Sequence, residues 1–154
     1  MKNILYVFFC SMLPIIELRG SILIGAGLGL DPIVNYAVSV IGNLLPIPFI
    51  LLFIRQILRW MKRVRGLSRV ATFIENKAHK HSGKVLKYAR LGLFLFVAIP
   101  VPGTGAWTGA LIAALFDMRL KYSMISIIAG VLCAGVIMIL ASYGVISCLS
   151  IFAE

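Results

Sequence analysis

Acidic residues and cysteines are scarce in this chain, which has 154 residues with 5 Asp and Glu against 15 Lys and Arg. Cys10, Cys133 and Cys148 show no CxxC spacing and lie in apolar runs, so we expect them to fill apolar space. No cluster of His, Cys and carboxylate residues has metal-ligand spacing, and no Ser-His-Asp arrangement is visible. The sequence therefore predicts no enzyme, no metal site and no cofactor.

Charge of either sign is scarce over most of the chain, because 61% of the residues are hydrophobic and 13% are charged. The uncharged runs are longer than a soluble domain would carry, so we expect a multi-pass integral membrane protein. Of the 15 Lys and Arg residues, 11 lie between Arg55 and Arg90, where Glu75 is the only acid. Cytoplasmic loops accumulate such residues. This predicts a protein of a prokaryotic cytoplasmic membrane in which residues 55–90 lie on the cytoplasmic side. No aromatic-rich or base-reading motif accompanies the charge, which disfavours nucleic acid as a partner.

Two apolar runs are long enough to span a bilayer as helices, at residues 33–54 and 122–141. The run beyond Gly144 is compatible with a short interfacial helix or with a continuation of the second span. Between residues 55 and 78, apolar positions recur every three or four residues among basic ones, which predicts an amphipathic helix on the membrane surface.

Two further apolar stretches are each interrupted by proline and glycine, at residues 14–20 and 99–109. The limbs beside each interruption would be about 14–16 Å long as helices, roughly half of a 30 Å hydrocarbon core. Each stretch could cross the bilayer as two stacked half-helices or fold back as a re-entrant hairpin. Hairpins place Arg119 and Lys121 on the same side as residues 55–90, so the positive-inside rule favours hairpins.

The two interrupted stretches match each other when the sequence is displaced by 86 positions. This displacement aligns Pro14 with Pro100 and Asp31 with Asp117, and a full span follows each aspartate. With hairpins, the two units enter the membrane from opposite sides, so we expect an all-α membrane protein built from two inverted repeats. The units are a first repeat at residues 1–54, a basic amphipathic connector at 55–90 and a second repeat at 91–154.

Glu17 and Arg19 are the only charged residues inside the first interrupted stretch. An ionised side chain inside a membrane costs about 2.5 to 3.5 kcal/mol, so a retained one usually faces a partner or a wet cavity. We expect Glu17 to carry a proton or bind a cation, and Arg19 to be its counter-charge or an anchor for an anionic head group. The alternative is a neutralising pair that only holds the hairpin loop.

The second interruption lacks charge but offers hydrogen-bond donors. The amides of Gly103, Thr104 and Gly105 could form an anion-binding nest at the start of the following helix, beside the indole N–H of Trp107. The alternative is a closely packed loop. In inverted-repeat transporters such interruptions lie together near the midplane, so we expect both loops to line one site. The remaining candidates are Asn43, Asp31 and Asp117, although the two aspartates more commonly act as helix caps.

Glycine recurs at helical spacing on the limbs that follow the interruptions. The pairs are Gly25 with Gly29 and Gly105 with Gly109. Pairs of small residues four positions apart allow close helix contact, so we expect packing inside the fold, with a homodimer as the alternative.

Three segments resemble the small multidrug export protein family: LPIIELRGS at residues 13–21, GNLLPIP at 42–48 and IPVPGTGAWTG at 99–109. The resemblance covers nearly the whole chain. A distant relationship of that family to the DedA superfamily implies two opposed re-entrant hairpins and proton-linked transport or flipping of lipids, including polyprenyl phosphate carriers. One departure is Ile22-Leu23, where the family pattern leads us to expect a proline. The site candidates at matching positions are Glu17, Arg19, Pro100, Pro102, Thr104 and Trp107.

These observations favour a small secondary transporter or lipid flippase, proton-coupled through Glu17, that moves an amphiphilic, anionic lipid-like substrate between the hairpins. Membrane lipids are the expected partners. Two alternatives stay open. One is a multidrug exporter of cationic compounds, and the other is a non-transporting membrane module whose basic connector binds anionic lipid.

Overall fold

The computed structural model describes residues 1–63, 84–101, 103–116 and 118–152, and within these ranges every secondary-structure element is an α-helix. The prediction of an all-α fold is therefore confirmed for the described residues. Residues 55–63 of the predicted amphipathic helix form the end of α4, residues 64–83 of the connector lie outside the described residues, and residues 84–90 belong to α6. The position of this helix on the membrane surface stays a prediction. The helices are α1 (Lys2–Met12), α2 (Glu17–Gly27), α3 (Pro32–Leu44), α4 (Ile47–Arg63), α6 (Lys84–Ala98), α7 (Ala106–Leu115) and α8 (Leu120–Phe152).

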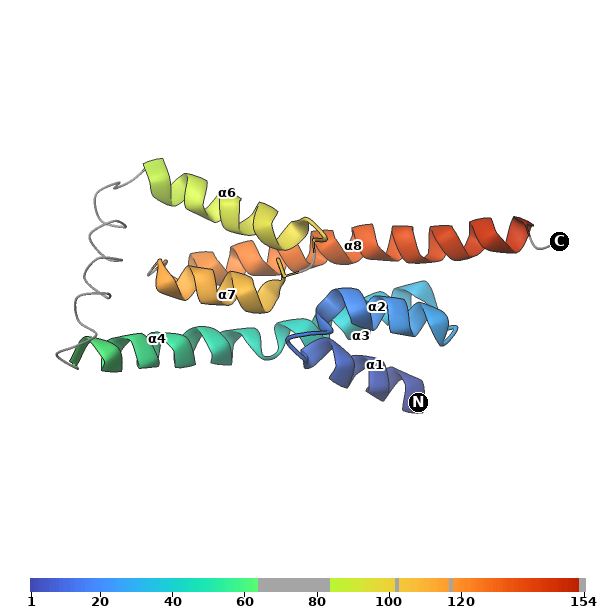
Figure 1. Ribbon diagram of the computed structural model, residues 1–154, viewed down its shortest axis with the longest axis horizontal. Helices are drawn as coiled ribbons and strands as arrows, with labels where there is room; N and C mark the ends of the chain where they lie inside the picture. The colour runs from blue at the N-terminus through green and yellow to red at the C-terminus, as the bar shows by residue number, and fades with distance from the viewer. Residues whose placement is uncertain (64–83, 102, 117, 153–154) are drawn as a thin grey trace.

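Two pairs of short helices fold back as helical hairpins (Figure 1). The helices α1 and α2 pack against each other, and their loop at residues 13–16 faces the middle of the molecule. The second pair, α6 and α7, opens toward the opposite end, so that its loop at residues 99–105 faces the first loop. The predicted hairpins are present as helix pairs, while their re-entrant course in a membrane and their relation as inverted repeats stay predictions.

Proline and glycine account for the positions of both loops. The first loop contains Pro14, which has no amide hydrogen and disfavours a helical conformation in the residue before it. Pro100 follows the end of α6 in the same way. Gly103 has φ +85°, a conformation that is strained for residues with a Cβ atom, so the second loop requires glycine there.

Two helical stretches are long and apolar enough to cross a membrane, Pro32–Ile57 and Leu120–Val145. The first comprises α3 and most of α4, with Pro46 between the two helices. The second belongs to α8, which continues without a break to Phe152, so the run beyond Gly144 extends the second span. Both predicted spans lie inside these stretches.

Large apolar side chains cover the outside of these stretches. Phe49, Phe53 and Leu140 have exposed fractions of 68%, 67% and 69%. An apolar surface of this kind suits contact with lipid. Two apolar helices and an apolar exterior support a membrane protein.

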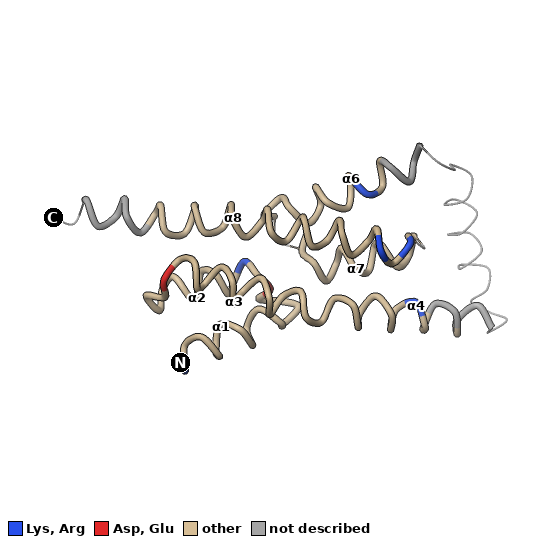
Figure 2. The backbone as a smooth tube through the Cα atoms, turned by 180° about the vertical axis from the view of Figure 1, so that it is seen from behind, with Lys and Arg blue, Asp and Glu red and all other residues tan. Residues whose placement is uncertain are grey.

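The described Lys and Arg residues gather mainly at one end of the molecule (Figure 2). Blue segments on α4, on α6 and between α7 and α8 all lie at the end opposite to the C-terminus. Two contacts hold these segments together: Arg55 donates to the Met118 carbonyl oxygen, and the Arg90 guanidinium lies 3.7 Å from the ring centroid of Tyr122. The basic ends of α4 and α6 are therefore tied to the start of α8.

The helix α8 contacts α6 and α3 at glycines. A Cβ atom at Gly130 would lie 2.7 Å from Cβ of Val97 on α6, and one at Gly135 would lie 2.6 Å from the Tyr36 ring on α3. Val97 also packs on Gly109 of α7, where an added Cβ would come within 2.7 Å of it. Small residues at these positions let the helix backbones approach closely.

The predicted glycine pairs are used inside the fold in three of their four positions. Gly105 and Gly109 pack against side chains of other helices, and Gly25 packs against Asn35. Gly29 has no atom within 4 Å of an added Cβ and instead forms the turn before α3, with φ +69°. A homodimer through these residues stays a prediction.

Candidate functional site

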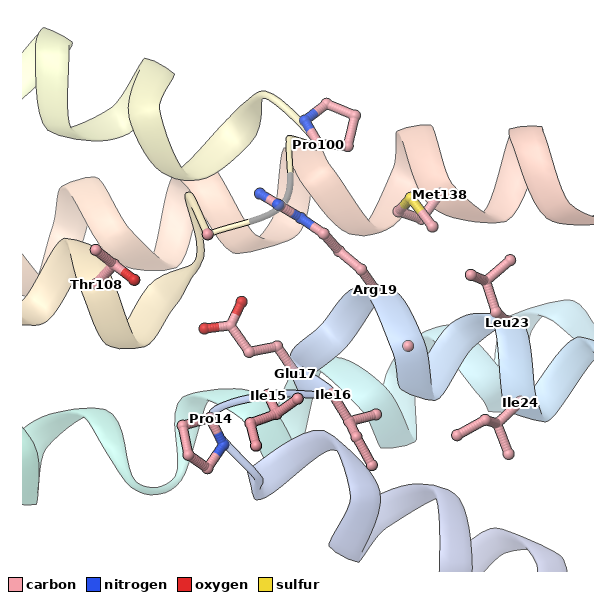
Figure 3. Close-up of a pocket in the computed structure, with 12 residues that line it drawn as sticks. Pro14, Ile15, Ile16, Glu17, Arg19, Leu23, Ile24, Pro100, Thr108 and Met138 are labelled. Atoms are coloured by element: carbon pink, nitrogen blue, oxygen red, sulfur yellow. The ribbon is translucent and has the colours of Figure 1, made fainter.

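Glu17 is the first residue of α2 and has an unusual backbone conformation. Its φ of +50° is the only positive φ of a non-glycine residue in the described part of the chain. Such a conformation costs about 1–3 kcal/mol and persists only where the surroundings hold it. Here the Glu17 amide donates to the Leu13 carbonyl oxygen (2.9 Å), which closes the first loop. In Figure 3 the Glu17 side chain extends toward the start of α7.

The Glu17 carboxylate lies at the N-terminal end of α7, which begins at Ala106. Its Oε1 accepts a hydrogen bond from the Trp107 amide (3.4 Å). The carboxylate also packs so closely on Gly105 that a Cβ atom there would overlap it. The first amides of a helix lack intrahelical acceptors and carry the positive end of the helix dipole, so this position favours a carboxylate.

This contact changes the interpretation of the second loop as an anion-binding nest. An anionic group does lie at the start of α7, but it is the protein's own Glu17. The Thr104 amide, one of the predicted donors, bonds the Val101 carbonyl oxygen (3.2 Å) within the loop. In this arrangement the loop binds a side chain of the first hairpin at the place where we expected an external anion.

The Arg19 guanidinium donates hydrogen bonds to the end of α6 and to the second loop. Its Nη2 donates to the carbonyl oxygens of Ile99 (2.8 Å) and Thr104 (2.7 Å), to Oγ1 of Thr104 (3.0 Å) and to the Val97 carbonyl oxygen (3.5 Å). Its Nη1 donates to the Val101 carbonyl oxygen. The last carbonyls of a helix lack intrahelical donors and carry the negative end of the dipole, so a cation is favoured after α6.

Glu17 and Arg19 therefore join the two hairpins. Arg19 bonds the carbonyl oxygens where α6 ends, and Glu17 bonds the first amides of α7. We call these two side chains, with their partners on residues 97–107, the clasp. The structure brings the predicted candidates of both loops together, namely Glu17, Arg19, Thr104, Gly105 and Trp107.

A cavity of ≈ 610 Å³ lies beside the clasp (Figure 3). Figure 3 shows apolar side chains of the first hairpin on one side and Pro100 and Met138 on the other. Glu17 and Arg19 are the charged residues among the described residues of its lining. The described lining consists of Pro14, Ile15, Ile16, Glu17, Arg19, Gly20, Leu23, Ile24, Pro100, Gly103, Thr108 and Met138.

Three other candidates have separate locations. Asp31 caps α3, because its Oδ1 accepts from the amides of Ile33 (2.9 Å) and Val34 (3.2 Å). Asn43 is buried in α3 and lies next to Glu17 and Arg19 on a second, smaller cavity. Pro102 and Asp117 lie outside the described residues.

Trp107 connects the clasp to a separate apolar groove. Its amide bonds Glu17, while its half-buried ring faces a groove of ≈ 770 Å³ beside α4. The indole Nε1 is buried and has no hydrogen-bond partner among the described residues. The other residues that line the groove are Phe49, Ile50, Leu52, Phe53 and Gln56.

Sequence reasoning missed the apolar residues that complete the larger cavity. Leu23 and Ile24 come from α2, and Met138 comes from α8. They occupy ordinary apolar positions of helices, so no local pattern separates them from lipid-facing residues. Their role becomes visible only when α8 is seen beside the two loops.

Comparison with known families gave one match. The model of a family described as "Putative small multi-drug export protein" matches residues 17–137. The matched range contains most of the residues that line the larger cavity, the whole of the first apolar stretch and the greater part of the second. No curated protein and no solved structure matches the chain.

Proposed function

This chain belongs to the small multidrug export protein family, and on that premise we propose that it is a small membrane transporter whose substrate binds between the two hairpin loops. The observation that carries this proposal is the cavity of ≈ 610 Å³ beside the clasp. A cavity of this size with apolar walls and few polar groups suits a small amphiphilic molecule. We therefore take an anionic, lipid-like amphiphile as the substrate and flipping between leaflets as the transport step.

In the proposed membrane arrangement, the stretches Pro32–Ile57 and Leu120–Val145 span the bilayer and both hairpins are re-entrant. The helices α1, α2 and α7 have 11, 11 and 10 residues, which is about half of the hydrocarbon thickness at 1.5 Å per residue. In this arrangement the hairpins enter from opposite sides, as inverted repeats do and as the DedA relationship proposed from the sequence resemblance implies. The basic end of the molecule faces the cytoplasm, by the positive-inside rule.

Protonation of Glu17 is the coupling step of the proposed cycle. The ionised carboxylate attracts both the N-terminal end of α7 and the Arg19 guanidinium, and a proton on Glu17 removes both attractions. The clasp then weakens and the hairpins separate. Arg19 exchanges the loop carbonyls for the anionic head group of the substrate, since a guanidinium binds phosphate and carboxylate strongly. Loss of the proton restores the clasp and expels the head group.

Transport in proteoliposomes, with and without a pH gradient, tests this cycle. We expect the unmodified protein to move a fluorescent anionic lipid faster under a gradient. Glu17→Gln should keep the fold but lose the response, because glutamine does not titrate. The matched control is Asp31→Asn, which removes a carboxylate outside the cavity and keeps a residue that caps helices. A normal gradient response in Glu17→Gln would rule out coupling through this residue.

The apolar groove favours a second candidate function, export of cationic compounds. Phe49, Phe53 and Trp107 line this groove, and aromatic faces attract organic cations. If this function is the correct one, Phe53→Leu lowers the export of a cationic dye from the same proteoliposomes. Neither the unmodified protein nor the Phe53→Leu variant should then transport the anionic lipid.

A further inference from the structure

Asn43 carries a buried polar atom that distinguishes it from the other asparagine of α3. Its side chain is 1% exposed, and its Oδ1 has no hydrogen-bond partner among the described residues. Asn35 is equally buried, but its Nδ2 donates to the Ile22 carbonyl oxygen (2.9 Å) and the Tyr143 hydroxyl (3.1 Å), and its Oδ1 accepts from Ser39 (3.4 Å). A buried amide oxygen without a donor is destabilising, so the space next to Asn43 is where a partner belongs.

The space next to Asn43 is a small cavity where the two hairpins meet α3 and α8. Its volume is ≈ 10 Å³, which is about what one water molecule needs. The polar side chains on its lining belong to Glu17, Arg19 and Asn43, and Gly105 lies on it beside the start of α7. The other lining residues are apolar: Leu18, Val97, Ala106, Val131 and Ala134.

The charges around this cavity favour a neutral occupant. A cation would face the Arg19 guanidinium and the positive end of α7, and an anion would face the Glu17 carboxylate. No second acid lies on the described lining, and the described residues contain no group of three His, Cys, Asp or Glu residues that could hold a metal ion. A buried water needs two to four polar partners, and Asn43 and Glu17 supply acceptors for both of its protons.

We propose that one water molecule in this cavity bridges Asn43 Oδ1 and the Glu17 carboxylate, and that Asn43 is thereby a positioning residue for the proton of Glu17. The inference rests on the proposed function, in which Glu17 takes up and releases the coupling proton. The bridge adds a hydrogen bond to the long one that Glu17 accepts from Trp107 (3.4 Å). Asn43 then helps to set the pH at which Glu17 is protonated, without touching the substrate.

Two substitutions at position 43, whose new side chains have the same shape as each other, test this role in the whole chain. Asn43→Thr keeps an oxygen that accepts from the water, whereas Asn43→Val has the same shape without that oxygen. Both are combined with Trp60→Phe, which leaves Trp107 as the only tryptophan, so that its fluorescence in liposomes reports the titration of Glu17. We expect Asn43→Val to move the midpoint to higher pH by about one pH unit, because the ionised carboxylate loses a hydrogen bond. Asn43→Thr should stay close to the unmodified protein.

Three further variants serve as controls. Glu17→Gln identifies the titration, which it should abolish. Asn35→Val removes a buried asparagine of the same helix whose polar atoms are bonded elsewhere, and it should lower the melting temperature without moving the midpoint. The smaller pair Asn43→Ser and Asn43→Ala differs by the same oxygen and repeats the test if the first pair does not fold.

Each outcome decides for or against the bridge. An unchanged midpoint in Asn43→Val, an equal shift in Asn43→Thr, or a titration that survives Glu17→Gln overturns the role of Asn43. If the midpoint moves as expected but transport ignores the pH gradient, the proposed function fails and the bridge stands. If transport responds to the gradient through Glu17 but the midpoint stays in place, only the bridge fails.

Discussion

At the scale of single residues, the clasp explains how a charged pair is accommodated in an apolar protein. Glu17 and Arg19 each bond a helix end of the other hairpin, where the backbone supplies partial charge of the opposite sign. Glu17 bonds the Trp107 amide at the start of α7, where the first amides of a helix have no intrahelical acceptor. These interactions also offset the strained backbone of Glu17, which is held in the left-handed region.

Gly105 is the residue at which this fit is closest, and substitution there should break it. Gly105→Ala places a Cβ atom on the Glu17 carboxylate, so we expect the free energy of unfolding to fall by about 1–3 kcal/mol. The control is Gly92→Ala on α6, where no atom lies within 4 Å of the added Cβ and stability should rise by up to about 1 kcal/mol. Thermal or denaturant unfolding in detergent measures both. Equal effects of the two substitutions would show that Glu17 does not pack on Gly105.

At the scale of helices, the elements that the sequence predicted well are those marked by local chemistry. Proline and glycine mark both hairpin loops, and long uncharged runs mark the two candidate spans. Contacts between distant segments were not predictable in detail, because no pattern near Asn43 points to Glu17. The anion-binding nest was predicted from the loop alone, and only the fold shows that Glu17 occupies its position.

The packing of α6, α7 and α8 around Val97 leads to a prediction at this scale. Gly130→Ala brings Cβ to 2.7 Å from Cβ of Val97, so the helices must separate, and we expect a loss of about 1–3 kcal/mol in the free energy of unfolding. Gly144→Ala is the control on the same helix, since no atom lies within 4 Å of its added Cβ. Adding Val97→Gly, which removes the Cβ that is approached, to Gly130→Ala should give a combined loss smaller than the sum of the two single losses. A purely additive double variant would contradict this packing.

At the scale of the whole molecule, the clasp joins the two hairpins in the middle, and other contacts join the helices at each end. Arg55 and Arg90 tie the basic ends of α4 and α6 to the start of α8, and Tyr143 bonds the Leu30 carbonyl oxygen (2.6 Å) near the other end. In the proposed cycle, the hairpins separate in the middle of the molecule while both ends stay joined. This arrangement suits a transporter that opens at its centre.

The proposed membrane arrangement predicts the side on which each end of the molecule is exposed. Re-entrant hairpins put the turn between α2 and α3 outside the cell, and they put the start of α8 inside together with residues 64–83. Asp31→Cys and Lys121→Cys, introduced singly after replacement of the three native cysteines, should therefore react with a membrane-impermeant thiol reagent from opposite sides of intact cells. Asp31→Cys should be labelled from outside, and Lys121→Cys only after the cells are opened. Labelling of Lys121→Cys in intact cells would mean that the interrupted segments cross the bilayer, and the paired re-entrant hairpins would have to be abandoned.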